Sequence, residues 1–172
     1  MRVYLPAIFL LATVIANAQD LSIFTGHWEG ELVWSKAGSK DVQRVKMQII
    51  IQPADTVGQY TWQIIYGDKG EDNRPYLLKP VDTSKGHWVI DERNGILIDQ
   101  YWLANRFSSL FSVQNSTIHD SYWIENDKLI AEFYGVSTSP IATSGAGTED
   151  IPTVKSYAIR TYQKAILEKK TK

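Results

Sequence analysis

The chain has 172 residues and carries 18 Lys and Arg against 19 Asp and Glu, which gives a formal net charge of −1. Such a balance predicts neither nucleic-acid binding nor attraction to anionic membranes. The sequence contains no cysteine, so disulfides, thiol catalysis, zinc–thiolate sites and a cysteine lipid anchor are excluded.

The first residues have the pattern of a secretory signal peptide. Arg2 precedes an apolar run over residues 5–15, and residues 16–18 read Ala-Asn-Ala, a small-residue cleavage pattern. The apolar run is shorter than the roughly 20 residues that a membrane-spanning helix needs. We therefore expect cleavage after Ala18, one domain over residues 19–172, no stable membrane insertion, and a secreted or periplasmic location.

The rest of the chain alternates apolar and polar residues in short runs, as half-buried strands do. Aromatic residues make up 12% of the chain, with six Trp and nine Tyr, a composition that favours strands. The dipeptide Asn94-Gly95 is a strong hairpin signal. In chain order the predicted strands cover residues 27–35, 43–51, 60–66, 74–81, 87–91, 96–98, 107–113, 118–124, 129–134 and 155–163.

Two segments near the C-terminus do not follow the strand pattern. Residues 137–152 are rich in Ser, Thr, Gly, Ala and Pro, which predicts a long flexible loop that could serve as a lid before the final strand. Residues 164–172 are predicted to form a charged tail, either frayed or with one helical turn.

The number and spacing of these strands predict an all-β fold. Regular antiparallel spacing fits a closed up-and-down barrel or a sandwich. We favour a single antiparallel up-and-down β-barrel of about 8–10 strands, because closure removes the exposed edges that so many strands would otherwise leave.

The segment Gly26-His27-Trp28 opens the first predicted strand and resembles the Gly-x-Trp signature of lipocalins and related calycin barrels. The resemblance implies a barrel in which this Trp plugs the closed end and an Arg from the last strand packs across its ring. Arg160 is the residue placed to do so, and such a cation–π contact would contribute about 0.5 to 2 kcal/mol. These three residues would close the barrel, and a ligand would bind in its interior or mouth.

Candidate ligand-binding residues come from aromatic and polar positions of the predicted strands. One parity of each strand should face the cavity, but a shift of one residue would exchange the two faces. Arg106 and Gln100 are candidates for reaching an acidic ligand group, and His119 would enter the cavity only if its face points inward. The full set of ligand-binding candidates is Trp62, Tyr66, Trp102, Arg106, Phe111, His119, Trp123 and Phe133.

No motif indicates an enzyme. His27, His87 and His119 lie on separate predicted strands, so a metal site is not predicted, and phosphate-binding, dinucleotide and nucleophile-elbow motifs are absent. Glu29 and Glu31 are expected to be solvated. The first hypothesis is a secreted lipocalin-like protein that binds a small hydrophobic molecule without covalent chemistry or cofactor. The alternatives are a barrel enzyme or chaperone handling a tetrapyrrole or other pigment, and a filled barrel that binds another protein.

Overall fold

The structure, a computed structural model, describes residues 21–171, so the predicted signal peptide over residues 1–18 lies outside the described residues. Within residues 21–171, no helix has the length and apolar character needed to cross a membrane. The elements are η1 Leu21–Phe24, β1 Gly26–Lys36, β2 Val42–Ile51, β3 Tyr60–Tyr66, β4 Asp72–Asp82, η2 Thr83–Lys85, β5 His87–Asp91, β6 Leu97–Leu103, β7 Arg106–Val113, β8 Ser116–Glu125, β9 Lys128–Ser137, β10 Ala142–Ser144, β11 Val154–Ser156 and β12 Ile159–Lys169.

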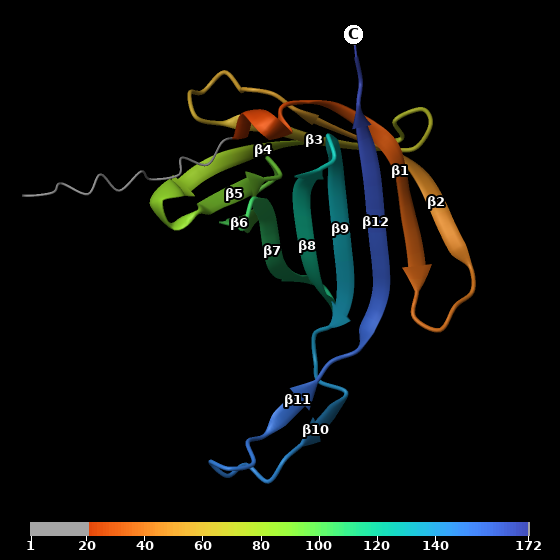
Figure 1. Cartoon of the computed structure of the whole chain (residues 1–172), viewed down its shortest axis with the longest axis vertical. Helices are drawn as coiled ribbons and strands as arrows, with labels where there is room; N and C mark the ends of the chain where they lie inside the picture. The colour runs from red at the N-terminus through yellow and green to blue at the C-terminus, as the bar shows by residue number, and fades with distance from the viewer. Residues whose placement is uncertain (1–20, 172) are drawn as a thin grey trace, which may run out of the picture.

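Ten of these strands form a closed antiparallel barrel (Figure 1) in the order β1-β12-β9-β8-β7-β6-β5-β4-β3-β2. Each barrel strand pairs with the next one in the chain, and β10 and β11 leave the barrel between β9 and β12. The barrel closes where β1 pairs with β12, from Trp28 opposite Lys169 to Lys36 opposite Thr161. The predicted all-β, up-and-down barrel is confirmed.

Tight turns with left-handed residues connect several strands. Ala104 and Asn105 (φ 47° and 63°) join β6 to β7, and Asn126 and Asp127 (φ 49° and 59°) join β8 to β9. Two residues with positive φ define the turn whose twist matches that of antiparallel strands. At the predicted Asn94-Gly95 hairpin, the Asn94 side-chain oxygen accepts a hydrogen bond of 2.9 Å from the backbone N–H of Ile96.

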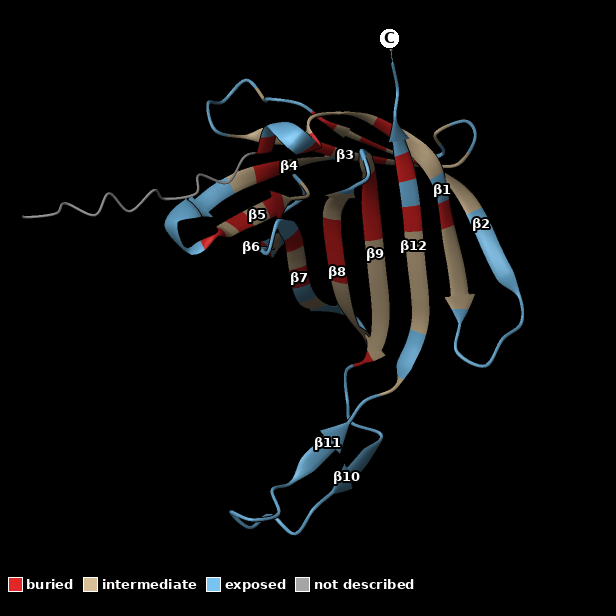
Figure 2. Cartoon of the chain, viewed as in Figure 1, coloured by how far each residue is buried: buried red, intermediate tan, exposed pale blue. Residues whose placement is uncertain are grey.

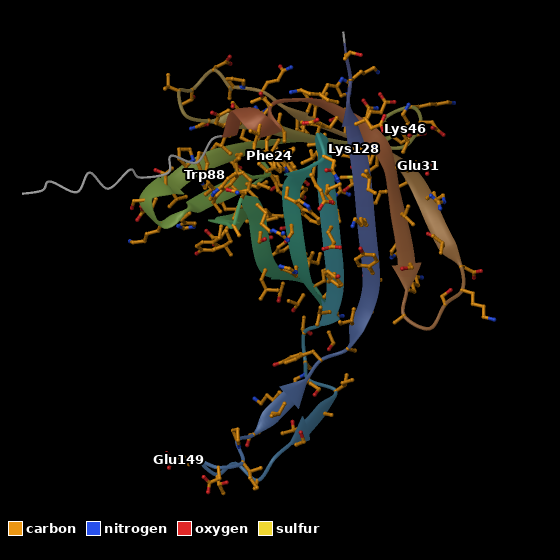
Figure 3. All side chains as sticks on the ribbon, in the orientation of Figure 1. Phe24, Glu31, Lys46, Trp88, Lys128 and Glu149 are labelled. Atoms are coloured by element: carbon orange, nitrogen blue, oxygen red, sulfur yellow. The ribbon has the colours of Figure 1, made fainter. Side chains whose placement is uncertain are left out.

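Aromatic side chains fill the end of the barrel beside η1. Phe107 is fully buried, and its ring centroid lies 4.9 to 6.0 Å from those of Phe24, Trp62, Trp88 and Trp102. Phe24 and Trp88 are labelled at this end in Figure 3. Buried residues of β8, β9 and β12 also gather toward it (Figure 2). This half of the barrel is therefore a packed core, which we call the aromatic plug.

Trp28 lies at this closed end, 2% exposed, and its indole N–H donates a hydrogen bond of 2.7 Å to the carbonyl of Phe24. The cation across its ring is Lys169, with Nζ 5.2 Å from the ring centroid. The predicted partner, Arg160, is exposed at the opposite end of β12, where its guanidinium donates to the carbonyl of Asn115. The assignment of Arg160 was wrong because the last strand runs further toward the C-terminus than its sequence pattern indicated.

The same extension changes the predicted tail. Strand β12 continues to Lys169, and residues 164–169 pair with both β1 and β9. Alternation explains the miss: Ala165 and Leu167 face the core and are fully buried, while Lys164, Ile166 and Glu168 alternate with them on the outward face. The charges of this segment therefore belong to a paired strand, and no frayed tail begins before its end.

The segment predicted as a long loop over residues 137–152 contains part of a hairpin. β10 pairs with β11 in register, with Ala142 opposite Ser156. In Figure 1 this hairpin projects away from the end of the barrel opposite η1, and Figure 3 places Glu149 at its tip. It does not lie across the barrel opening, so this arrangement is not that of a closed lid.

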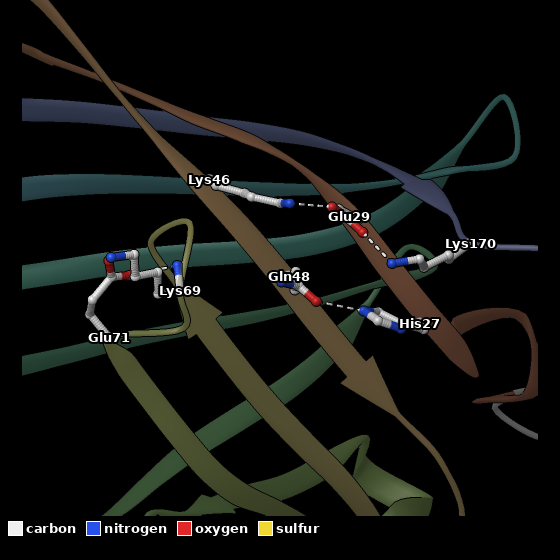
Figure 4. Close-up of polar contacts among 7 residues, drawn as sticks. All are labelled: His27, Glu29, Lys46, Gln48, Lys69, Glu71 and Lys170. Atoms are coloured by element: carbon white, nitrogen blue, oxygen red, sulfur yellow. Dashed lines mark hydrogen bonds and ion pairs between the residues drawn. The ribbon is translucent and has the colours of Figure 1, made fainter.

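The outer face of β1 carries ion pairs, as expected for solvated glutamates. Glu29 accepts from Lys46 at 2.7 Å and from Lys170 at 3.0 Å (Figure 4). The hydrogen bond from Lys46, followed by that from Lys170, lowers the pKa of Glu29 to about 2. Glu31 pairs with Arg44 at 3.1 Å.

Candidate functional site

The half of the barrel away from the aromatic plug contains a cavity of about 340 Å³. Its walls come from eight of the barrel strands, mainly from the ends that lie opposite η1, so closure of the barrel itself forms the site. The cavity-lining residues are Ile64, Tyr66, Arg74, Tyr76, Ile90, Glu92, Ile98, Gln100, Phe111, Ser116, Ile118, Asp120, Tyr122, Phe133, Tyr134, Gly135, Thr161 and Gln163.

Much of the wall is apolar. Four isoleucines come from β3, β5, β6 and β8, and two phenylalanines from β7 and β9. These residues are Ile64, Ile90, Ile98, Ile118, Phe111 and Phe133. Aliphatic and aromatic walls of this kind favour the apolar body of a small ligand through area removed from water.

A polar cluster on three neighbouring strands lies beside these apolar walls. Gln100 of β6 is fully buried, Ser109 of β7 is 3% exposed, and Asp120 of β8 is 5% exposed. Ser109 pairs directly opposite Asp120, and its hydroxyl donates a hydrogen bond of 2.6 Å to the carboxyl. Gln100 lies close enough to Asp120 to lower the pKa of that carboxyl, although neither Nε2 nor Oε1 of the amide has hydrogen-bond geometry with a described residue.

Burial sets the protonation of the groups around the cavity. Loss of solvent contact raises the pKa of Asp120 above its ordinary value, and the hydrogen bond from Ser109 offsets this only in part. The same cause raises the pKa of Tyr66 to about 12 and that of Tyr122 well above its ordinary value. Both tyrosine hydroxyls therefore keep their protons at neutral pH and can donate hydrogen bonds.

One cation lies where the cavity opens. Arg74 donates to Asp72 through Nε at 3.0 Å, and its guanidinium lies 5.0 Å from the ring centroid of Tyr66. Both contacts come from side chains on the same inner wall of β3 and β4, so the guanidinium is held in place before any ligand binds.

A second hollow of about 410 Å³ shares Tyr66, Arg74 and Gln163 with the cavity. It forms because residues 42–45 of β2 pair with β1 alone, while β2 meets β3 only at residues 47–50. The barrel therefore opens more widely on this side, and Arg74 lies between the two hollows.

The predicted ligand-binding residues divide into three groups. Tyr66, Phe111 and Phe133 line the cavity. Trp62 and Trp102 face inward but belong to the aromatic plug. The third group faces outward and does not line the cavity: Arg106 pairs with Trp123, its guanidinium 4.8 Å from the ring centroid, and His119 pairs with the exposed Leu110.

Strand β8 shows why the outward group was misplaced. The candidates His119 and Trp123 were chosen for their chemistry, whereas the face that points inward holds Ile118, Asp120 and Tyr122. That face is the more apolar of the two, and its apolar character was the available signal. Asp120 was missed for this reason; Ser109 of β7 and Arg74 of β4 were not among the candidates, while Gln100 had been named.

No group of three His, Cys, Asp or Glu residues suited to a metal ion occurs within residues 21–171. Among the histidines, His27 contacts Gln48 at 2.7 Å (Figure 4) and His87 contacts Asp99 at 2.7 Å. The polar groups that line the cavity are hydroxyl, amide, carboxyl and guanidinium groups.

No protein-family model matches the chain, and a search of curated proteins finds no match. Among solved structures, the chain is similar to a protein of unknown function from the DUF3598 family of Nostoc punctiforme, with a TM-score of 0.61 and 12% identity. The match covers 87% of this chain and 49% of that protein, so the chain spans about half of its length. At this identity the likeness concerns the barrel fold alone.

Proposed function

We propose that the barrel binds a small amphipathic molecule in its interior cavity, reversibly and without covalent chemistry. One observation carries the proposal: apolar walls and a fully buried amide with no hydrogen-bond partner among the described residues line the same cavity. Buried polar groups in native proteins nearly always have partners. A cavity that keeps such a group beside apolar walls is suited to an amphipathic ligand, whose polar group bonds the amide while its apolar part lies against the walls.

The size of the site limits the ligand. Ligand pockets occupy roughly 300 to 1,000 Å³, and the cavity, at about 340 Å³, lies near the lower limit. The aromatic plug prevents deeper entry, because its rings are in contact with one another. The ligand therefore enters from the open end, past Arg74, with its apolar body against the isoleucine and phenylalanine walls.

Export and a lipocalin-like role belong to the same proposal. The Ala-Asn-Ala pattern at residues 16–18 supports export. Gly26 and Trp28 at the closed end, with Lys169 over the indole ring, support a lipocalin-like arrangement that uses a different cation. A free barrel with one closed end and one open end suits the transport or storage of a small molecule.

Paired tryptophan substitutions on β6 test the proposal. Ile98 lines the cavity, whereas its neighbour Leu97 points outward and is 63% exposed. Binding of the uncharged fluorescent probe N-phenyl-1-naphthylamine is measured by titration for the wild type, Ile98→Trp and Leu97→Trp, with circular dichroism to check folding. We expect the wild type and Leu97→Trp to bind alike and Ile98→Trp to bind at least tenfold more weakly.

Two results would contradict the proposal. One is the absence of probe binding to the folded wild type. The other is equal binding by folded Ile98→Trp, which would place the probe outside the cavity.

A further inference from the structure

Gln100 identifies the part of the cavity with unmet hydrogen-bonding capacity. Its side chain is fully buried, lines the cavity, and leaves both the amide nitrogen and the amide oxygen without a partner among the described residues. The nitrogen donates and the oxygen accepts, and this holds whichever way the amide is turned. The wall therefore offers one donor and one acceptor side by side.

We propose that the ligand carries an uncharged carboxamide-type group, with a donor beside an acceptor, and that Gln100 and Asp120 bind this group. The inference rests on the proposed function, because it names the ligand class for the same cavity. Primary amides, lactams and cyclic imides share this chemistry. A group of this kind pairs with both atoms of the amide and so removes the cost of leaving them unpaired.

The two charged alternatives fit the amide less well. An alkylammonium group has only donors, so it would leave the Nε2 donor of Gln100 unpaired. A carboxylate has only acceptors, so it would leave Oε1 unpaired and would lie beside the carboxyl of Asp120. A buried polar atom left without a partner costs about 1 to 3 kcal/mol, and sites built on such atoms discriminate strongly between ligands with and without the matching group.

Asp120 supports an uncharged ligand group. Ser109 donates to its carboxyl oxygen Oδ1 at 2.6 Å, which fixes the carboxyl beside Gln100. Burial raises the pKa of Asp120 and so favours its protonated form. A protonated carboxyl adds a further donor to the wall and removes the charge that would attract a cation.

A matched ligand series tests the inference. Octanamide, octylamine and octanoate share one apolar chain and differ only in the polar group. Their affinities are measured at pH 7 by displacement of N-phenyl-1-naphthylamine. We expect octanamide to bind roughly tenfold more tightly than either charged compound, in line with one unpaired buried atom. Tighter or equal binding of octylamine or octanoate would overturn the inference.

Two variants locate the preference. Gln100→Met keeps the length of the side chain but removes the amide, and it should abolish the preference for octanamide while raising Tm in the absence of ligand. Gln63→Met changes a glutamine of β3 that bonds Asn73 outside the cavity, and it should leave the preference intact. Retention of the preference in folded Gln100→Met would overturn the inference. If Gln100→Met does not fold, the wild-type ligand series decides alone.

The outcomes separate the inference from the proposed function. If the probe binds in the cavity but the three octyl compounds bind equally, the proposed function stands and the carboxamide inference fails. If neither the probe nor any octyl compound binds the folded wild type, both fail.

Discussion

Replacing Phe107 with alanine tests whether the barrel is packed at one end and hollow at the other. Phe107 is fully buried, and four aromatic rings surround it at centroid distances of 4.9 to 6.0 Å. Its neighbours belong to four different elements, so they cannot easily collapse into the space. A Phe→Ala change at such a site costs about 3 to 5 kcal/mol. Because 1 kcal/mol shifts Tm by roughly 2 to 4 °C in a domain of this size, we expect Phe107→Ala to lower Tm by about 12 °C.

Phe111→Ala is the matched control, because Phe111 lies on the same strand and the same inner face but beside the cavity. Its ring is only partly buried, so we expect a loss of about 1 kcal/mol from the lost burial. Urea unfolding and thermal scans of both variants, followed by circular dichroism, give the two free energies of unfolding. Similar losses for the two variants would refute the division into aromatic plug and cavity.

Three further predictions concern protonation, barrel closure and the hairpin. Burial raises the pKa of Asp120 above its ordinary 3.8, so the folded state holds this proton more tightly than the unfolded state does. The contribution of Asp120 to stability therefore falls as pH rises from 3.8 through the folded pKa. Asp120→Asn should therefore be more stable than the wild type at pH 7 and lose this advantage near pH 3, as measured by urea unfolding; no gain at pH 7 would count against it. Lys169→Ala should lower the free energy of unfolding by about 0.5 to 1 kcal/mol through loss of the contact with Trp28, whereas Lys169→Arg should keep that contact and its stability. Equal losses for the two variants in the same unfolding assay would mean that the contact is not cationic. Replacing residues 138–157 with Asn-Gly should change stability by less than about 1 kcal/mol, since Ser137 and Ala158 already pair at 2.9 Å; a loss of probe binding in this variant would show that the hairpin takes part in the site.

The sequence predicted the architecture because alternation along each strand is a local property. Residues 43–51 and 60–66 alternate clearly, and β2 and β3 match them closely. The Asn94-Gly95 signal likewise lies in a hairpin. The end of β12 was harder to predict, because three of residues 164–169 are charged and the charged residues do not keep to one face.

The site was less predictable because it depends on how separate strands meet. Gln100, Ser109 and Asp120 come from three strands, and nothing in their local sequence indicates that one lies opposite another. The division of the interior into plug and cavity depends on the packing of Phe24 from η1 against distant rings. The partner of Trp28 depended on the length of β12, which local composition concealed.

Native mass spectrometry of the protein purified from its source organism shows directly whether the barrel holds a ligand. We expect one small uncharged molecule per chain, released on denaturation and absent from the Ile98→Trp variant expressed in the same cells. A mass equal to that of the chain alone, together with no thermal stabilisation by octanamide or N-phenyl-1-naphthylamine, would contradict a ligand-binding barrel.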